Sequence, residues 1–160
     1  MLIANALTIF VLEAQLPPIV PIPGVKLGLA NVVTLFAVYL LGCRETVRIQ
    51  IIRIVLGSIF TGQIVSFLYS LSGGVCSLLV LLCCSKLLSR EMIWLAGIFS
   101  AVAHIIGQLA IAVPILGSIA VLYYAPIVFF TSILTGCFTG LCVQFLFKKH
   151  NILFRCLLHN

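Results

Sequence analysis

The sequence contains no aspartate and only three glutamates, and charged residues make up 8% of its 160 positions. A soluble domain carries about 25% charged residues, so the chain departs strongly from that class. Without aspartate there is no Asp-rich site of the kind that binds magnesium and a diphosphate. A Walker A loop and a glycine-rich dinucleotide fingerprint are also absent. No catalytic constellation is visible, and we expect a protein that is not an enzyme and has no cofactor.

The seven cysteines do not form a recognisable motif. They are scattered through apolar stretches, only Cys83 and Cys84 are adjacent, and no pair has the CxxC spacing. An odd number of cysteines in apolar surroundings is typical of free thiols that pack as small apolar side chains. We therefore predict neither a disulfide framework nor a metal site.

What the chain has in abundance is hydrophobic residues, which make up 63% of the total. A soluble chain of this length could not bury that much apolar surface in one core. We therefore predict an all-α integral membrane protein. The formal net charge of +6 does not indicate nucleic-acid binding, because the nine lysines and arginines are dispersed instead of clustered with stacking aromatic residues.

Six apolar segments are predicted to be transmembrane helices, at residues 2–16, 26–41, 44–59, 63–85, 92–113 and 119–147. The first is short enough to be a secretory signal peptide, but it has neither a basic n-region nor a small-residue cleavage site, so we favour a retained helix. The fifth is expected to stop at Pro114. Short loops make neighbouring helices antiparallel, in a single six-helix domain over residues 1–147. Residues 148–160 are predicted to be a basic cytoplasmic tail, weakly amphipathic and lying at the inner membrane interface.

The stretch from Pro17 to Asn31 differs from the rest of the chain. Four of the six prolines lie within seven residues here, followed by Gly24, Lys26 and Gly28. Proline lacks an N–H and fixes φ, so this stretch cannot begin inside a transmembrane helix. We interpret residues 17–25 as an outer loop that forms a lid over a ligand site.

The cations predict the orientation. With the N-terminus inside, only Lys26 faces outward, and Arg53 falls within a span. The other seven face the cytoplasm, namely Arg44, Arg48, Lys86, Arg90, Lys148, Lys149 and Arg155. Seven against one in short loops is a strong positive-inside bias. Both termini are therefore predicted to be cytoplasmic.

Arg53 is the most informative polar residue within the spans. It lies nine residues beyond Arg44, on the order of 13 Å along the helix, and shares a face with Gln50 and Gly57. A charge near mid-bilayer costs at least ~2.5 kcal/mol on insertion scales, so it should face the bundle. Two interpretations stay open: a structural arginine bound to backbone carbonyls or extending to the interface, and an arginine that faces a ligand.

The other helices add polar groups at helical spacing. In the fifth segment Ser100, His104 and Gln108 recur every four residues, which places a hydroxyl, an imidazole and an amide on one stripe and favours a cavity wall over a single helix–helix hydrogen bond. The small and hydroxylated residues of the fourth segment fit tight helix packing and a pocket equally well; they are Ser66, Tyr69, Ser70, Gly73 and Gly74.

In the sixth segment the GxxxG of Gly136 and Gly140 favours close packing against another helix over a chemical role. Tyr123 and Tyr124 fit either an interfacial aromatic belt or a pocket wall.

Three runs carry a resemblance over most of the chain: PGVKLGLANVVTLFAVYLLG, RIVLGSIFTGQIVSFLYSLSGG, and AVAHIIGQLAIA followed by YYAP. They resemble the heptaprenyl diphosphate synthase component I family, also called Gx transporters. That family is similar in turn to the substrate-binding S components of energy-coupling factor (ECF) vitamin transporters. The resemblance implies a six-helix, multi-pass protein of the bacterial cytoplasmic membrane with a lid loop between its first two helices. It also implies a bound small molecule near the outer face, and a transmembrane partner with two ATPases that drives uptake.

Two hypotheses of function follow. The first is a membrane component that captures a small molecule for uptake, anionic or prenyl-related, with membrane lipid around it and no nucleic-acid partner. Its candidate binding residues are Lys26, Asn31, Arg53, Ser70, His104, Gln108 and Tyr124. Few convergent polar groups in an apolar cavity are typical of a ligand site. The second is a non-catalytic membrane subunit or anchor for a soluble prenyl diphosphate synthase in isoprenoid or quinone side-chain synthesis.

Overall fold

The structure is a computed structural model that describes Thr8, residues 31–62 and residues 64–158, with the side chains of residues 61 and 150–158 left out. The expected first helix (2–16, apart from Thr8), the expected loop at 17–25 and Lys26 lie outside the described residues. Every element of the described part is helical: α2 (Asn31–Leu40), α3 (Cys43–Thr61), α4 (Ile64–Leu87), η1 (Arg90–Met92), α5 (Ile93–Leu116), η2 (Ile119–Tyr124) and α6 (Ala125–Leu158).

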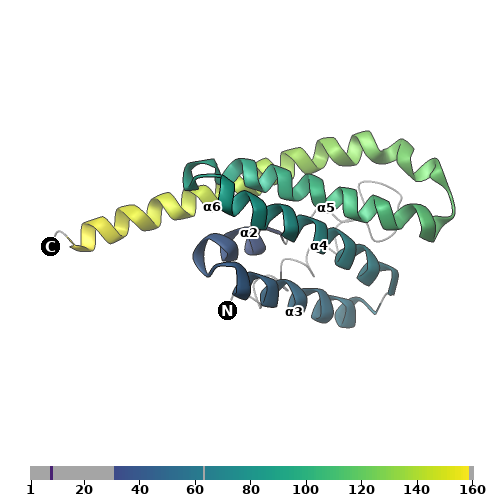
Figure 1. Ribbon diagram of the computed structural model, residues 1–160, viewed down its shortest axis with the longest axis horizontal. Coiled ribbons are helices and arrows are strands. Elements are labelled where there is room, and N and C mark those ends of the chain that lie inside the picture. Colours follow the sequence, from purple (N-terminus) through teal and green to yellow (C-terminus); the bar gives the residue numbers. More distant parts are fainter. Residues whose placement is uncertain (1–7, 9–30, 63, 159–160) are drawn as a thin grey trace.

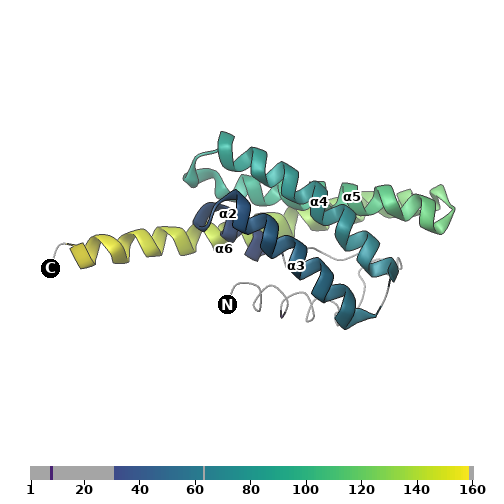
Figure 2. The same ribbon diagram turned by 60° about the horizontal axis from the view of Figure 1, so that its bottom comes forward.

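The long helices α3, α4, α5 and α6 run antiparallel to their neighbours in sequence (Figure 1). α4 packs between α3 and α5, and α5 packs between α4 and α6. The short helix α2 contacts all four of them, and the turned view shows it beside the start of α3 (Figure 2). The predicted antiparallel bundle is therefore confirmed for the part of the chain from α2 onward.

Glycine allows the two sharp turns at one end of the bundle. Gly62 ends α3 with φ 63°, and its N–H donates to the carbonyl of Ser58. Gly117 ends α5 with φ 60°. These left-handed conformations are strained for residues with a Cβ and are easily adopted by glycine.

Two of the predicted helix ends are wrong. α5 continues through Pro114 to Leu116 instead of stopping before the proline. Because Pro114 lies in the last turn, only its own hydrogen bond to the preceding turn is lost, and little helix remains to be disturbed. The sixth helix does not end at Phe147 but runs to Leu158, since residues 141–158 contain neither glycine nor proline and lysine favours helix. At its start, residues 119–124 form the 3₁₀ turn η2.

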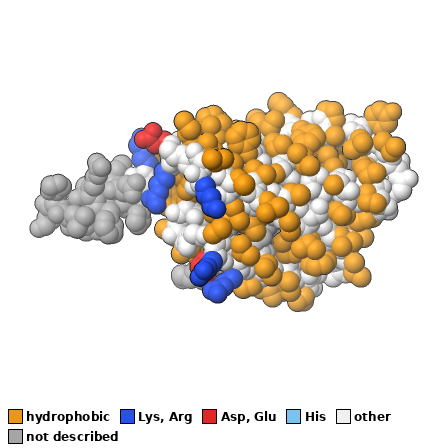
Figure 3. All heavy atoms as spheres, viewed as in Figure 1, with side chains coloured by type: hydrophobic (Ala, Val, Ile, Leu, Met, Phe, Trp, Pro, Cys, Tyr) orange, Lys and Arg blue, Asp and Glu red, His pale blue; other side chains and the backbone are white. Residues whose placement is uncertain are grey.

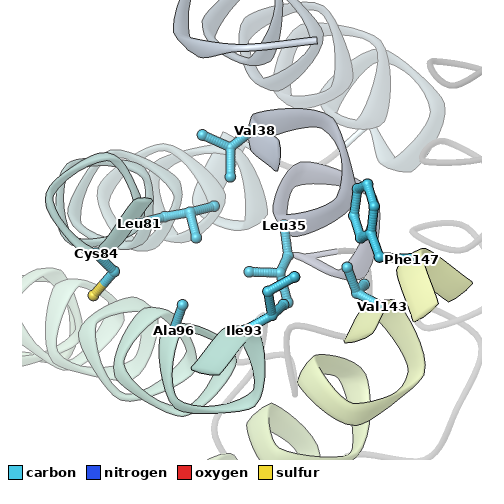
Figure 4. Close-up of a cluster of buried hydrophobic side chains, with 8 residues drawn as sticks. All are labelled: Leu35, Val38, Leu81, Cys84, Ile93, Ala96, Val143 and Phe147. Atoms are coloured by element: carbon cyan, nitrogen blue, oxygen red, sulfur yellow. The ribbon is translucent and has the colours of Figure 1, made fainter. Parts of the chain in front are cut away.

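Two apolar clusters fill the bundle. The cluster nearer the end where α6 leaves is drawn in Figure 4 and joins four helices; it comprises Leu35, Val38, Leu81, Cys84, Ile93, Ala96, Val143 and Phe147. The second lies nearer the opposite end and comprises Tyr69, Ile105, Leu109, Ala112, Val121 and Val128. Leu35 and Val38 of α2 complete the first cluster, so this short helix packs into the core of the bundle (Figure 4).

Glycines bring α5 and α6 into backbone contact. A Cβ on Gly97 would lie 2.5 Å from the carbonyl oxygen of Gly136 and 2.9 Å from the Cα of Gly140. A Cβ on Gly140 would lie 2.6 Å from the Cα of Trp94. The GxxxG of α6 therefore serves helix packing, as the sequence predicts.

Charge gathers at one end of the molecule. Among the residues whose side chains are described, six cations are exposed: Arg44, Arg48, Lys86, Arg90, Lys148 and Lys149. They surround the end from which the C-terminal part of α6 projects, while the rest of the visible surface is mostly hydrophobic (Figure 3). Three helical stretches are long and apolar enough to cross a membrane, at Ile64–Leu87, Arg90–Leu116 and Ile119–Lys149. The described part of the chain thus has the character of a membrane protein.

Among the described residues, the other predicted spans are not long and apolar enough to cross a membrane by the same criteria. α3 contains four charged residues, which are Arg44, Glu45, Arg48 and Arg53. α2 is apolar but has ten residues. A span count of six and the cytoplasmic placement of both termini therefore stay predictions.

Candidate functional site

Polar side chains from three helices are buried inside the bundle, and those of α3 and α5 reach one turn of α4 at Gly73 and Gly74. We call this group the polar cluster; it consists of Asn31 and Thr34 on α2, Gln50 and Arg53 on α3, and His104 and Gln108 on α5. All six are at most 7% exposed. Glycines of a fourth helix, α4, form one wall. A polar group of this size in the middle of an apolar bundle is the most unusual feature of the molecule.

Helical spacing pairs α2 with α3. Asn31 and Thr34 lie three residues apart, as do Gln50 and Arg53, so each pair occupies one face of its helix. The Thr34 hydroxyl donates to Oε1 of Gln50 at 2.8 Å. Nη2 of Arg53 lies 3.5 Å from Oδ1 of Asn31, a long hydrogen bond. Two successive turns of each helix therefore meet through polar atoms.

Gly73 and Gly74 of α4 make room for polar groups on two sides. A Cβ on Gly74 would lie 2.6 Å from Nε2 of Gln50, and a Cβ on Gly73 would lie 2.9 Å from Nδ1 and Cε1 of His104. Any larger residue at these positions would occupy the space that the amide and the imidazole fill. The adjacent glycines thus place Gln50 and His104 against one turn of α4.

The predicted stripe on α5 is buried as expected. Gln108 and His104 meet at 3.0 Å through their Nε2 atoms. With the Gln108 amide as donor, Nε2 of His104 accepts and the ring proton lies on Nδ1. Ser100 instead turns toward α4, where its hydroxyl donates to the carbonyl of Ser77 at 3.4 Å. Gly107, next to Gln108, admits the backbone of α4, since a Cβ there would lie 2.6 Å from the carbonyl oxygen of Ser72.

In three side-chain amides of the polar cluster, only the oxygen or only the nitrogen makes a hydrogen bond. Within the described part of the chain, Nδ2 of Asn31, Nε2 of Gln50 and Oε1 of Gln108 are buried and have no hydrogen-bond partner. A buried polar atom without a partner costs about 1–3 kcal/mol. Three such atoms among the described residues make the polar cluster a candidate binding site.

Arg53 brings a permanent charge to the cluster. Its side chain is 3% exposed, and a guanidinium stays protonated in proteins. The described glutamates, Glu45 and Glu91, both lie exposed at the charged end, where Glu45 pairs with Arg48 at 2.7 Å. A charge inside an apolar bundle is costly, which makes Arg53 a candidate functional residue.

Four of the seven predicted site residues are buried and lie in two contacting pairs, Asn31 with Arg53 and His104 with Gln108. Ser70 is also buried, one turn before the glycines of α4. Tyr124 does not join them; it ends η2 and is 37% exposed. Lys26 lies outside the described residues.

Two members of the polar cluster were not among the candidate binding residues predicted from the sequence. Gln50 was placed on the same helix face as Arg53 but was not chosen as a binding residue. Thr34 gives a weaker signal, three residues after Asn31, because a threonine in a membrane helix usually bonds its own backbone.

Two surface hollows of the described part contain no residue of the polar cluster. One, of about 410 Å³, is lined by Val55, Ser58, Ile59, Gly62, Ile64 and Phe67. The other, of about 680 Å³, is lined by Gly117, Ser118, Ile119, Ala120, Leu122 and Tyr123. Both lie at turns of the uncharged end. No group of three or more metal-ligating side chains occurs among the described residues.

These features define a helical protein of membrane character with a charged residue and amides buried among its helices. Comparison with family models identifies it further. Residues 2–146 match the model described as heptaprenyl diphosphate synthase component I, and the chain belongs to this family. The family resemblance seen in the sequence is thereby confirmed. No curated protein and no solved structure matches significantly.

Proposed function

We propose that the protein is a substrate-binding membrane component that captures a small molecule for uptake, in the manner of an ECF S component. The observation that carries the proposal is the polar cluster, with three buried amide atoms that lack partners in the described part of the chain. Six spans with both termini in the cytoplasm, in the bacterial cytoplasmic membrane, belong to the same proposal. In this proposal the protein binds the small molecule and does not catalyse a reaction.

The position of the polar cluster supports binding over a purely structural role. A structural polar contact between membrane helices needs one hydrogen bond, worth about 1 kcal/mol. Here six polar side chains from three helices are buried, and three of their amide groups are only partly satisfied within the described part of the chain. Incomplete polar networks are destabilising. A bound molecule that completes the network offsets this cost.

The charge distribution supports the orientation. In the described part the exposed cations lie at one end, and the turns at Gly62 and Gly117 form the other end, without a charged residue. The positive-inside rule places the charged end in the cytoplasm. The expected loop at 17–25 and Lys26 would then face outward, on the side from which a molecule for uptake arrives.

The test is native mass spectrometry of the protein purified in mild detergent, to detect a small molecule retained from the host. We expect a retained molecule in the wild type and its loss in Arg53→Ala. The matched control is Arg48→Ala, on the same helix but exposed and paired with Glu45, which should retain it. Absence of a retained molecule in the wild type would reject the binding function, and equal retention in both variants would reject the role of Arg53 in it.

A second candidate is a non-catalytic membrane subunit of a prenyl diphosphate synthase. The family description favours it, and so does the projection of α6 beyond the charged end, where a soluble partner would meet it (Figure 2). It predicts co-purification with a synthase and no retained small molecule. The same mass spectra, recorded from the native host, therefore separate the two functions.

A further inference from the structure

We infer that the molecule held by the polar cluster presents both hydrogen-bond acceptors and a hydrogen-bond donor, as an amide, urea or imide group does, and is not an acceptor-only diphosphate. The inference rests on the proposed binding function and concerns the chemistry of the ligand. It follows from the atoms that the described part of the chain leaves without partners: the amide NH₂ groups of Asn31 and Gln50, and the amide oxygen of Gln108.

The two NH₂ groups require acceptors. Oδ1 of Asn31 faces Nη2 of Arg53, and Oε1 of Gln50 accepts from Thr34, so each amide has its oxygen engaged and its nitrogen available. Both nitrogens belong to side chains that are at least nine-tenths buried. A ligand oxygen or ring nitrogen next to α2 and α3 satisfies them.

The side chain of Gln108 requires a hydrogen-bond donor from the ligand instead of an acceptor. Its nitrogen contacts His104 at 3.0 Å, and its oxygen is the atom left over. The side chain is 1% exposed, so bulk water does not reach that oxygen. A ligand N–H or O–H satisfies it, whereas a phosphate oxygen would face it with a second lone pair and leave it unsatisfied.

The two requirements together select the ligand class. A fully ionised diphosphate carries only acceptors and could satisfy Asn31 and Gln50 but not Gln108. A group with a carbonyl beside an N–H satisfies both, because donor and acceptor lie next to each other.

The first experiment determines the elemental composition of the molecule extracted from the purified wild-type protein, by high-resolution mass spectrometry. We expect a compound that contains nitrogen and no phosphorus. A retained diphosphate would overturn the inference and leave the binding function standing. Absence of any retained molecule would overturn the binding function itself, and the inference with it.

The second experiment reads the role of Gln108 through three variants. Gln108→Glu keeps an acceptor, and we expect it to retain at least about a third of the wild-type amount. Gln108→Met keeps the shape without the acceptor and should retain less than a tenth. Gln144→Met is the matched control on α6, where the Gln144 oxygen accepts from the backbone N–H of Trp94, and it should retain the wild-type amount.

For an acceptor-only ligand the order of the first two variants would reverse, because a carboxylate at position 108 repels an anion. Monodisperse elution and an unfolding transition confirm that each variant is folded. Millimolar inorganic diphosphate serves as a direct probe: it should leave the Tm of the wild type unchanged, and a rise in Tm would contradict the inference.

Discussion

At the scale of single residues, the polar cluster depends on the absence of side chains as much as on their presence. Gly73 and Gly74 leave room for His104 and Gln50, whereas Gly107 leaves room for the backbone of α4. A side-chain end can rotate away from an added methyl group, but a backbone carbonyl cannot. The same substitution should therefore have different consequences at Gly74 and Gly107.

We predict that Gly107→Ala destabilises the protein by about 1–3 kcal/mol, the usual cost of overpacking, and that Gly74→Ala destabilises it less. The Cβ at Gly107 would meet the Ser72 carbonyl at 2.6 Å, and the Cβ at Gly74 would meet the end of Gln50 at 2.6 Å. Both variants gain the same helix propensity, so the difference between them isolates packing. Tm values in detergent measure it, and a larger loss at Gly74 would contradict the prediction.

The same residues show how far the sequence could predict the site. Arg53, His104 and Gln108 stand out because polar residues in apolar helices are conspicuous, and their spacing assigns each to one helix face. What spacing cannot predict is which faces of different helices meet. The contact of Gln50 with Thr34 depends on the position of α2 against α3, and the exclusion of Tyr124 depends on the path of η2.

At the scale of elements, α6 is held at the point where it leaves the bundle. Phe147 is 8% exposed; its ring stacks on Phe36 at 5.3 Å between centroids and meets Tyr39 edge-on at 6.5 Å. The guanidinium of Arg90 lies 6.0 Å from the centre of the same ring. Helices α2 and α6 and the 3₁₀ turn η1 are therefore joined around one aromatic side chain.

We predict that Phe147→Ala lowers the free energy of unfolding by about 3–5 kcal/mol, the range for a buried aromatic residue. The matched control is Phe145→Ala on the same helix, where the side chain is 67% exposed and faces away from the bundle. That variant should change stability by less than about 1 kcal/mol. Denaturant titration in detergent compares the two, and equal losses would show that Phe147 does not anchor α6.

At this scale the sequence predicted which segments form helices better than it predicted where the helices end. The predicted segments 44–59, 63–85 and 92–113 correspond to α3, α4 and α5 to within a few residues at each end. Gly62 and Gly117 end α3 and α5 by adopting positive φ. Pro114 misled the prediction, since a proline in a last turn costs little. The end of α6 was missed because a change from apolar to basic residues marks a membrane boundary and does not end a helix.

At the scale of the whole molecule, the charge pattern divides the protein into two ends. Six exposed cations of the described part surround one end, and the turn between α5 and η2 lies at the other (Figures 1 and 3). Sequence alone predicted this division, because loops alternate sides whenever helices are antiparallel. The structure adds that the polar cluster lies about halfway between the two ends, beside the middle of α4 and α5.

The orientation leads to a prediction about labelling in intact cells. Cys43, exposed beside Arg44 at the charged end, should not react with a membrane-impermeant maleimide when the other cysteines are replaced. A cysteine placed at Ser118, exposed at the opposite end, should react in a variant without native cysteines. Permeabilised cells should label both, which controls for thiol reactivity. Because the positive-inside rule acts on short loops such as these, the reverse pattern would mean that the uncharged end faces the cytoplasm, and the orientation proposed for capture and uptake would no longer be tenable.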